Sequence, residues 1–242
     1  MRTDLCTDSN LSHRRAFGTR ALTAAALVLS SLLLSACGGG GDGGDHDRLP
    51  LPTPNPNPRP NTLSCSSEGL AKSAQSSYAT VCMLTSSGEI VFELYTPYAP
   101  VTVNNFLRYV ADGAYSNTLF HRVDRDFVIQ GGAYTSGMVE RFPAYAPIVS
   151  ESNNGLANLP GTLAMARRGD PNSATNQFFI NVVDNPGLDY KNAAQPGYTV
   201  FGRVISGMAT VQAINAVPTY RYSDTDLQPQ QEVLIYWVQR LK

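Results

Sequence analysis

The sequence predicts a mainly β fold in which eight strands close a small barrel and two α-helices cap its ends. Short apolar runs separated by turn residues recur from about residue 78 to the C-terminus, as is typical of strands. Two further segments carry apolar residues at helical spacing instead. The chain before them divides into a targeting segment and a linker, so we expect one folded domain, at residues 78–242.

The first two predicted strands, residues 79–85 and 89–95, are joined by Ser86-Ser87-Gly88 and are typical of a β-hairpin. Six later runs have the same strand character. A barrel of this size has an interior that side chains fill. The six later runs are residues 118–123, 127–131, 161–166, 177–182, 200–205 and 233–238.

Each of the two predicted helices has one apolar face. The first runs from Val103 to Val110, where apolar residues fall at i, i+3, i+4 and i+7, and Pro100 marks its beginning. The second spans residues 207–217, and Ser206 is its expected N-cap. Because each apolar face needs a partner, each helix is expected to cover an open end of the barrel.

Residues 1–36 resemble a bacterial lipoprotein signal peptide. Arginines precede the apolar run 21–35, which is too short to span a bilayer comfortably. Leu34-Ser35-Ala36-Cys37 then resembles a lipobox, in which cleavage leaves a lipid-modified Cys37. An ordinary signal peptide with an incidental cysteine is the alternative. The lipobox predicts a bacterial periplasmic protein with a lipid anchor, and Gly38 after the cysteine favours the outer membrane.

Residues 37–77 are expected to form a flexible tether. Glycine dominates the chain after Cys37, and proline alternates with other residues in 50–60, which favours an extended polyproline conformation. Such a tether would hold the domain off a membrane, and a docking motif for a proline-binding partner is the alternative. Cys65 and Cys82 form a candidate disulfide in an oxidising compartment, although their spacing does not show whether the geometry permits it.

The residue inventory disfavours several classes of function. With 18 Lys plus Arg against 19 Asp plus Glu, the chain has no basic footprint for nucleic acid. His121 is the only histidine of the folded region, no Gly-x-Ser-x-Gly motif is present, and metal ligation needs more partners than one histidine. We interpret His121 as a structural residue bonded to the backbone, and we expect neither metal nor cofactor. Arg122 points to the opposite strand face, and its spacing alone does not exclude a surface charge.

Four stretches closely resemble the cyclophilin family of peptidyl-prolyl cis-trans isomerases. They are Phe120-His121-Arg122-Val123, the run from Phe127 to Gly132, residues 161–166 and residues 177–181. The match continues in order to the C-terminus, and details including Tyr198 are most similar to periplasmic bacterial members. The family fold is an antiparallel eight-stranded barrel capped by two helices. The resemblance implies faster X-Pro rotation during the folding of exported proteins.

The resemblance also implies a role for each site residue. Arg122, Phe127 and Gln130 would be catalytic, with the guanidinium stabilising the twisted imide more than the planar ground state. Apolar residues would hold the proline ring, amides would bond the substrate backbone or orient Arg122, and one segment would pair with the extended peptide. The residues implied to bind substrate are Met165, Ala166, Arg167, Gln177, Phe179, Leu188 and Tyr198.

Three readings of the function remain open from the sequence. The first is an isomerase that acts on proline-containing, unfolded or partly folded polypeptides. The second is a binding or chaperone module for the same segments, with catalysis incidental. The third is that the tether and the domain form part of an envelope assembly. No heptad or exposed amphipathic stripe argues for more than a monomer. Gly187 stands where many family members have tryptophan, so tight cyclosporin binding is not implied.

Overall fold

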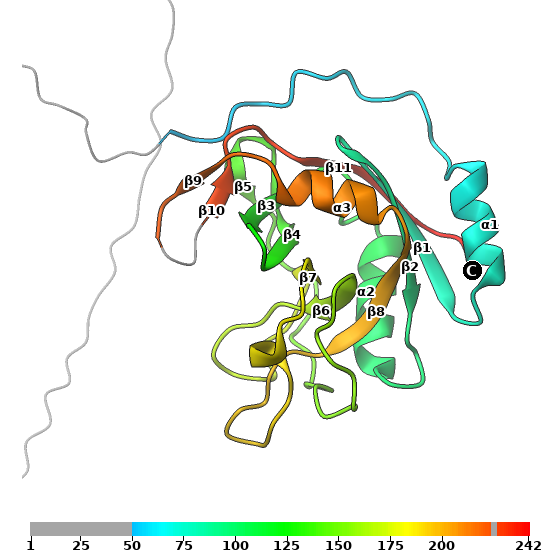
Figure 1. Ribbon diagram of the computed structural model, residues 1–242, viewed down its shortest axis with the longest axis vertical. Helices are drawn as coiled ribbons and strands as arrows, with labels where there is room; N and C mark the ends of the chain where they lie inside the picture. The colour runs from blue at the N-terminus through cyan, green and yellow to red at the C-terminus, as the bar shows by residue number, and fades with distance from the viewer. Residues whose placement is uncertain (1–49, 224–226) are drawn as a thin grey trace, which may run out of the picture. The chain divides into compact units, whose positions relative to one another are not determined.

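Antiparallel strands pair side by side and close on themselves in this computed structural model (Figure 1). Their order around the barrel ends where the pairing of residues 118–124 with residues 128–135 closes it. This confirms the predicted mainly β barrel, and each predicted strand is present. In the barrel order the strands are β3 (Thr118–Asp124), β11 (Leu234–Arg240), β1 (Ala79–Thr85), β2 (Gly88–Leu94), β8 (Val200–Ser206), β6 (Thr162–Met165), β7 (Phe178–Asn181) and β4 (Val128–Thr135).

The structure describes residues 50–223 and 227–242. The predicted signal peptide, the lipobox and Cys37 lie outside these residues. Within the described ranges, no helix is long and apolar enough to span a bilayer.

Several short elements decorate the barrel. β5 (Val139–Glu140) extends the sheet beside β4, and β9 (Thr219–Arg221) pairs with β10 (Leu227–Pro229) in a separate two-stranded sheet. Two 3₁₀ turns, η1 (Ser136–Met138) and η2 (Pro186–Leu188), lie in the long connections. Elements this short carry too few residues for a periodic pattern, so the sequence did not predict them.

Both predicted helices are present. α2 (Pro100–Ala111) begins at the predicted proline, and α3 (Met208–Asn215) lies within the predicted 207–217. The predicted cap of α3 is wrong, because Gly207 occupies the N-cap position at φ 90° and no side chain caps the helix. A Cβ atom at Gly207 would lie 2.2 Å from the Glu89 carbonyl oxygen, so close approach of two backbones requires glycine there.

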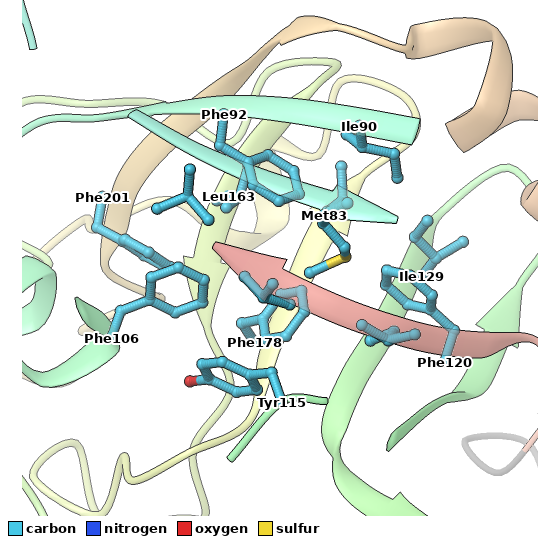
Figure 2. Close-up of a cluster of buried hydrophobic side chains, with 14 of the residues drawn as sticks. Met83, Ile90, Phe92, Phe106, Tyr115, Phe120, Ile129, Leu163, Phe178 and Phe201 are labelled. Atoms are coloured by element: carbon cyan, nitrogen blue, oxygen red, sulfur yellow. The ribbon is translucent and has the colours of Figure 1, made fainter. Parts of the chain in front are cut away.

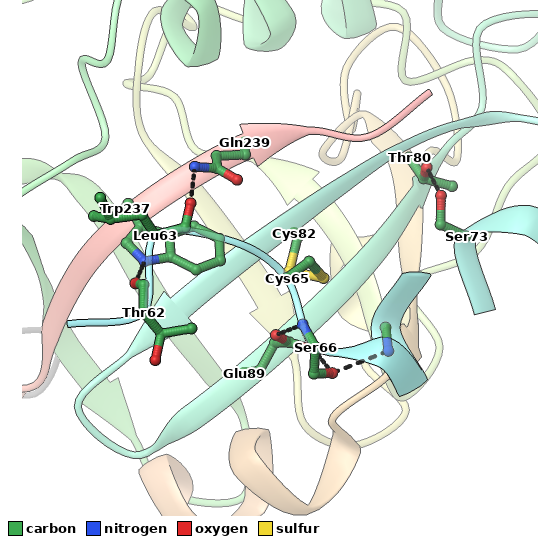
Figure 3. Close-up of a disulfide and its surroundings, with 11 residues drawn as sticks. Thr62, Leu63, Cys65, Ser66, Ser73, Thr80, Cys82, Glu89, Trp237 and Gln239 are labelled. Carbon is green, nitrogen blue, oxygen red and sulfur yellow. Dashed lines mark hydrogen bonds between the residues drawn. A yellow bond between two sulfur atoms is a disulfide. The ribbon is translucent and has the colours of Figure 1, made fainter. Parts of the chain in front are cut away.

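The chain before residue 78 departs from the predicted tether. α1 (Ser67–Gln75) lies in that region, and the Ser66 side chain caps it by accepting a hydrogen bond from the Gly69 amide at 3.1 Å. Ser66 in turn donates from its backbone N and its Oγ to the Glu89 carboxylate at 2.8 and 2.6 Å (Figure 3). The folded part therefore begins earlier than residue 78.

Residues 53–65, which we term the N-terminal strap, lie along the outside of the barrel (Figures 1 and 3). Trp237 Nε1 donates to the Thr62 carbonyl at 2.8 Å, and Gln239 Nε2 donates to the Leu63 carbonyl at 2.6 Å. These two carbonyls follow directly after the proline-rich run 50–60 and attach the strap to β11. A disulfide between Cys65 and Cys82 then fastens the strap to β1.

Aromatic and aliphatic side chains together fill the barrel interior (Figure 2). Phe106 of α2 lies 5.6 Å from Phe178 of β7 and 5.2 Å from Phe201 of β8, measured between ring centroids. Val211 and Ile214 are the fully buried apolar residues of α3. Each helix thus buries the apolar face that its spacing predicted, and the core holds the strands that carry the site.

Candidate active site

A cavity of about 400 Å³ lies outside the barrel core, next to β3, β4 and β7. Its volume is within the range of small-ligand pockets. It combines one guanidinium with apolar and aromatic side chains. Its lining residues are Arg122, Phe127, Val128, Gln130, Ala166, Arg167, Phe179, Leu188 and Tyr198.

Arg122 is the only β3 residue that lines this cavity. Its Nη2 lies 2.7 Å from Asp124 Oδ2, and its Nη1 lies 3.5 Å from Gln130 Oε1. The guanidinium carbon is 5.9 Å from the centroid of the Phe127 ring. The side chain is 18% exposed, so the charge is partly desolvated yet open to the cavity. Partial desolvation strengthens its interaction with a bound group.

Gln130 lies between Arg122 and a second amide. Its Nε2 donates to Gln177 Oε1 at 2.8 Å, which leaves its Oε1 directed at the guanidinium. Gln177 does not line the cavity. It lines an adjoining groove of about 260 Å³ that shares Gln130, Ala166 and Arg167 with the cavity.

The apolar side of the cavity is a separate hydrophobic cluster. Phe179 is 4% exposed and meets the Tyr198 ring edge to face at 5.5 Å. Leu188 is placed by η2, because its amide donates to Asn185 O and its carbonyl accepts from the Tyr198 amide. The cluster also contains Phe127 and Val128. Together these side chains form an apolar receptacle beside the guanidinium.

Met165 is a correction to the implied substrate-binding set. Its side chain is 2% exposed, belongs to the barrel core and does not line the cavity. Successive strand residues point to opposite faces, so Met165 points inward while Ala164 and Ala166 pack with the cavity cluster. Val128, which sequence reasoning missed, lines the cavity instead, and its position two residues before Gln130 on the same strand could have indicated this.

Arg167 forms the rim rather than the floor of the cavity. Its Nε and Nη2 donate to the Gly197 carbonyl at 2.9 and 2.8 Å, and its guanidinium carbon lies 4.6 Å from the centroid of the Tyr198 ring. The Ala166 amide donates to the Gln177 carbonyl at 3.0 Å. A peptide would therefore pair with other main-chain groups of this segment.

His121 lies behind the site and does not line the cavity. It is 8% exposed, and its ring centroid lies 4.8 Å from that of Tyr134. Burial lowers the pKa of its imidazole to about 4, although hydrogen bonding to the Leu119 backbone opposes the shift. A neutral, buried ring fits the structural role predicted for it.

The site holds an acidic residue that no sequence pattern indicated. Asp124 pairs with Arg122 across two residues of β3, where both side chains share one face. The cavity as a whole offers a fixed positive charge beside an apolar pocket. It can bind a neutral group with an apolar ring and stabilise negative or lone-pair density at its edge.

Residues 80–239 match the family model described as cyclophilin type peptidyl-prolyl cis-trans isomerase. The chain is 49% identical over 159 residues to a peptidyl-prolyl cis-trans isomerase of Acinetobacter baylyi, covering 65% of this chain and 82% of the relative. It is 46% identical over 153 residues to peptidyl-prolyl cis-trans isomerase B of Escherichia coli, covering 62% and 93%.

A similar solved structure is a Cryptosporidium parvum cyclophilin type peptidyl-prolyl cis-trans isomerase in the presence of the dipeptide Ala-Pro. The two chains are 30% identical with a TM-score of 0.58, over 67% of this chain and 99% of the other.

Proposed function

This chain belongs to the cyclophilin-type peptidyl-prolyl cis-trans isomerase family and is a peptidyl-prolyl cis-trans isomerase, and we propose that it acts on X-Pro bonds of exported proteins as they fold. The observation that carries the proposal is the Arg122 guanidinium at the edge of an apolar cavity lined by Phe127, Phe179 and Leu188. This arrangement suits a proline ring next to the bond that rotates.

The reaction needs no nucleophile. Amide resonance sets a rotation barrier of about 18 to 20 kcal/mol, and twisting the bond localises the lone pair on the proline nitrogen. A guanidinium beside that nitrogen stabilises the twisted state more than the planar one, which is the requirement for catalysis. Arg122 supplies this charge, and Asp124 and Gln130 contact it from two sides.

The apolar pocket serves to bind the proline ring and to position the peptide. Enclosing a proline ring between Phe127, Phe179 and Leu188 removes apolar surface from water and fixes the bond next to Arg122. The solved relative, which was determined in the presence of the dipeptide Ala-Pro, supports a proline-containing peptide as the ligand of this cavity. The adjoining groove beside Ala166 and Gln177 would receive the residues before the proline.

The isomerisation rate of a proline tetrapeptide, coupled to proteolysis of the trans form, tests the function. Arg122→Ala should lower kcat/KM about 100-fold or more, as removal of one transition-state donor does elsewhere. Arg125→Ala is the matched control, because Arg125 lies on the same hairpin, bonds the Ala216 carbonyl and does not line the cavity. Equal and negligible rates for the unaltered protein and Arg122→Ala would favour a binding or chaperone module instead.

We also propose that a lipid on Cys37 anchors the protein to a bacterial membrane on the periplasmic side. The lipobox-like Leu34-Ser35-Ala36-Cys37 supports the anchor. The Cys65–Cys82 disulfide supports an oxidising compartment. Several acyl chains on one cysteine would make attachment stable, since each buried methylene contributes about 0.8 kcal/mol.

Labelling with radioactive palmitate in a bacterial host tests the anchor. The full chain should carry label and sediment with membranes, and Cys37→Ser should do neither. Label that persists in Cys37→Ser, or no label in either protein, would contradict the proposal. Separating inner from outer membranes in the same cells tests the expected outer-membrane location.

A further inference from the structure

The Asp124 carboxylate is the closest charged partner of Arg122 in the described residues. The ion pair is 2.7 Å long, and the two side chains are 18% and 24% exposed. Its length is that of a strong charge-assisted hydrogen bond, whereas the 3.5 Å contact from Arg122 to Gln130 is at the outer limit for a hydrogen bond. Asp124 is therefore the stronger of these two anchors of the guanidinium.

The Asp124 side chain does not stabilise the turn that Asp124 begins. Asp124 begins the turn that closes the hairpin between β3 and β4, because its carbonyl accepts from the Phe127 amide at 3.1 Å. Aspartate at such a position often bonds the turn amides. Among the contacts of the described residues, however, this carboxylate meets Arg122 and no amide of the turn.

A different carboxylate holds the turn in place. The Asp126 amide donates to Asn215 Oδ1 at 3.0 Å, and Asn215 Nδ2 donates to Asp126 Oδ1 at 3.2 Å. Arg125 adds a hydrogen bond to the Ala216 carbonyl. The end of α3 thus fixes the turn independently of Asp124.

Asp124 has two opposed effects on Arg122. It holds a side chain that would otherwise lose much rotamer freedom when it binds substrate, and its negative charge weakens the positive potential at the cavity. Solvent reaches both groups and screens the second effect. Misplacement of a catalytic group by about 1 Å can cost about 100-fold in rate, so the first effect should dominate.

We propose that Asp124 is a positioning residue of this isomerase, which holds the Arg122 guanidinium at the edge of the proline cavity. The inference rests on the role of Arg122 proposed above. Asp124 acts through Arg122 alone, because it does not line the cavity. Removal of the Asp124 carboxylate should therefore raise the energy of the transition state more than it weakens substrate binding.

Steady-state kinetics with the proline tetrapeptide test the inference. Asp124→Ala should lower kcat about 5- to 20-fold with little change in KM, the pattern for an interaction made in the transition state. Asp124→Asn keeps an acceptor oxygen and should recover part of the loss. Asp126→Asn is the control, since it lies in the same turn, keeps an oxygen for Asn215 and does not touch Arg122. A rate for Asp124→Ala equal to or above that of the unaltered protein would overturn positioning.

A double-mutant cycle tests whether Asp124 acts through Arg122. In an Arg122→Lys background, Asp124→Ala should change kcat by less than about 2-fold, because residues that act as a unit are not additive. The same fold-loss in both backgrounds would overturn the inference. Such a result would show that Asp124 affects kcat by stabilising the folded structure and not by positioning Arg122.

The nitrogen NMR signal of Arg122 Nε–H gives a readout that needs no turnover. It should be sharp in the unaltered protein and in Asp126→Asn, and broadened or lost in Asp124→Ala. An unchanged signal would contradict positioning even if the protein proved to have no isomerase activity. Conversely, an inactive protein with the expected NMR result would overturn the proposed function alone.

Discussion

Gln130 and Gln177 are joined by a hydrogen bond of 2.8 Å, donated by Gln130 Nε2 to Gln177 Oε1, across 47 residues of sequence. The bond fixes which end of the Gln130 amide faces Arg122, since the donor end is used and the oxygen lies 3.5 Å from Nη1. Gln177 therefore orients Arg122 indirectly, through Gln130. Only in this orientation does the Gln130 amide oxygen, and not its NH2 group, face the guanidinium.

Removal of the Gln177 amide should loosen this arrangement. Gln177→Ala leaves Gln130 able to turn, so we expect kcat/KM for the proline tetrapeptide to fall by about 3- to 10-fold, a loss of about 1 kcal/mol typical of one hydrogen bond. Gln75→Ala, at an exposed site on α1, is the control. Full activity of Gln177→Ala would show that Gln130 needs no second amide.

The aromatic wall of the cavity should contribute mainly to binding. Phe127→Ala removes apolar contact that ground state and transition state share, so KM should rise about 10-fold with a smaller change in kcat. The effect on thermal stability should be small, because Phe127 is only partly buried. Leu70→Ala, an exposed apolar position on α1, should change neither constant. A fall in kcat at constant KM would assign Phe127 a role in the rotation step.

How much of this structure the sequence predicts depends on how far apart in the sequence the interacting residues lie. Short apolar runs separated by turn residues predicted every barrel strand, because both signals are local to each strand. The resemblance named Arg122 and Gln130, which line the cavity, but it named Met165 where Val128 lines it, because the packing of β6 and β4 decides which face of each strand meets the cavity. The strap was predicted as tether because its partner Trp237 is 175 residues away from Thr62. Such contacts leave no trace in local composition.

The buried His121 should make stability depend on pH. Its pKa is lowered from 6.5 to about 4 in the folded protein, so between these values the unfolded chain binds a proton that the folded protein does not. The contribution of His121 to the free energy of unfolding is therefore fully present above pH 6.5. It is lost as the pH falls toward 4 and amounts to about 3 kcal/mol, at about 1.4 kcal/mol per pKa unit. His121→Gln should reduce this loss.

Thermal unfolding from pH 7.5 to pH 4 measures the effect. The difference in melting temperature between the unaltered protein and His121→Gln should change with pH only in the window where the histidine titrates, since carboxylates contribute equally to both. A constant difference across that range would show that His121 keeps its ordinary pKa. The kcat/KM profile should stay flat through pH 6.5, because a neutral structural ring contributes no proton.

The Cys65–Cys82 disulfide should stabilise the fold without affecting catalysis. It closes a loop with a sequence separation of 17, so the double variant Cys65→Ala with Cys82→Ala should lose about 3 kcal/mol of unfolding free energy. Neither sulfur lines the cavity, so kcat/KM at a temperature well below unfolding should be unchanged. Trp237, the single tryptophan, belongs to the same buried cluster as both cysteines, so its fluorescence should report strap release during urea unfolding.

Trp237→Phe separates the strap hydrogen bond from the covalent link. It keeps an apolar ring but removes the 2.8 Å bond to the Thr62 carbonyl, so it should lose about 1 kcal/mol in a urea titration followed by circular dichroism. In the cysteine-free background the same change should cost less, because the strap is then already partly detached. Equal costs in both backgrounds would show that the strap stays docked without its disulfide, held by Gln239 and the bridge of Thr53 to Gln231.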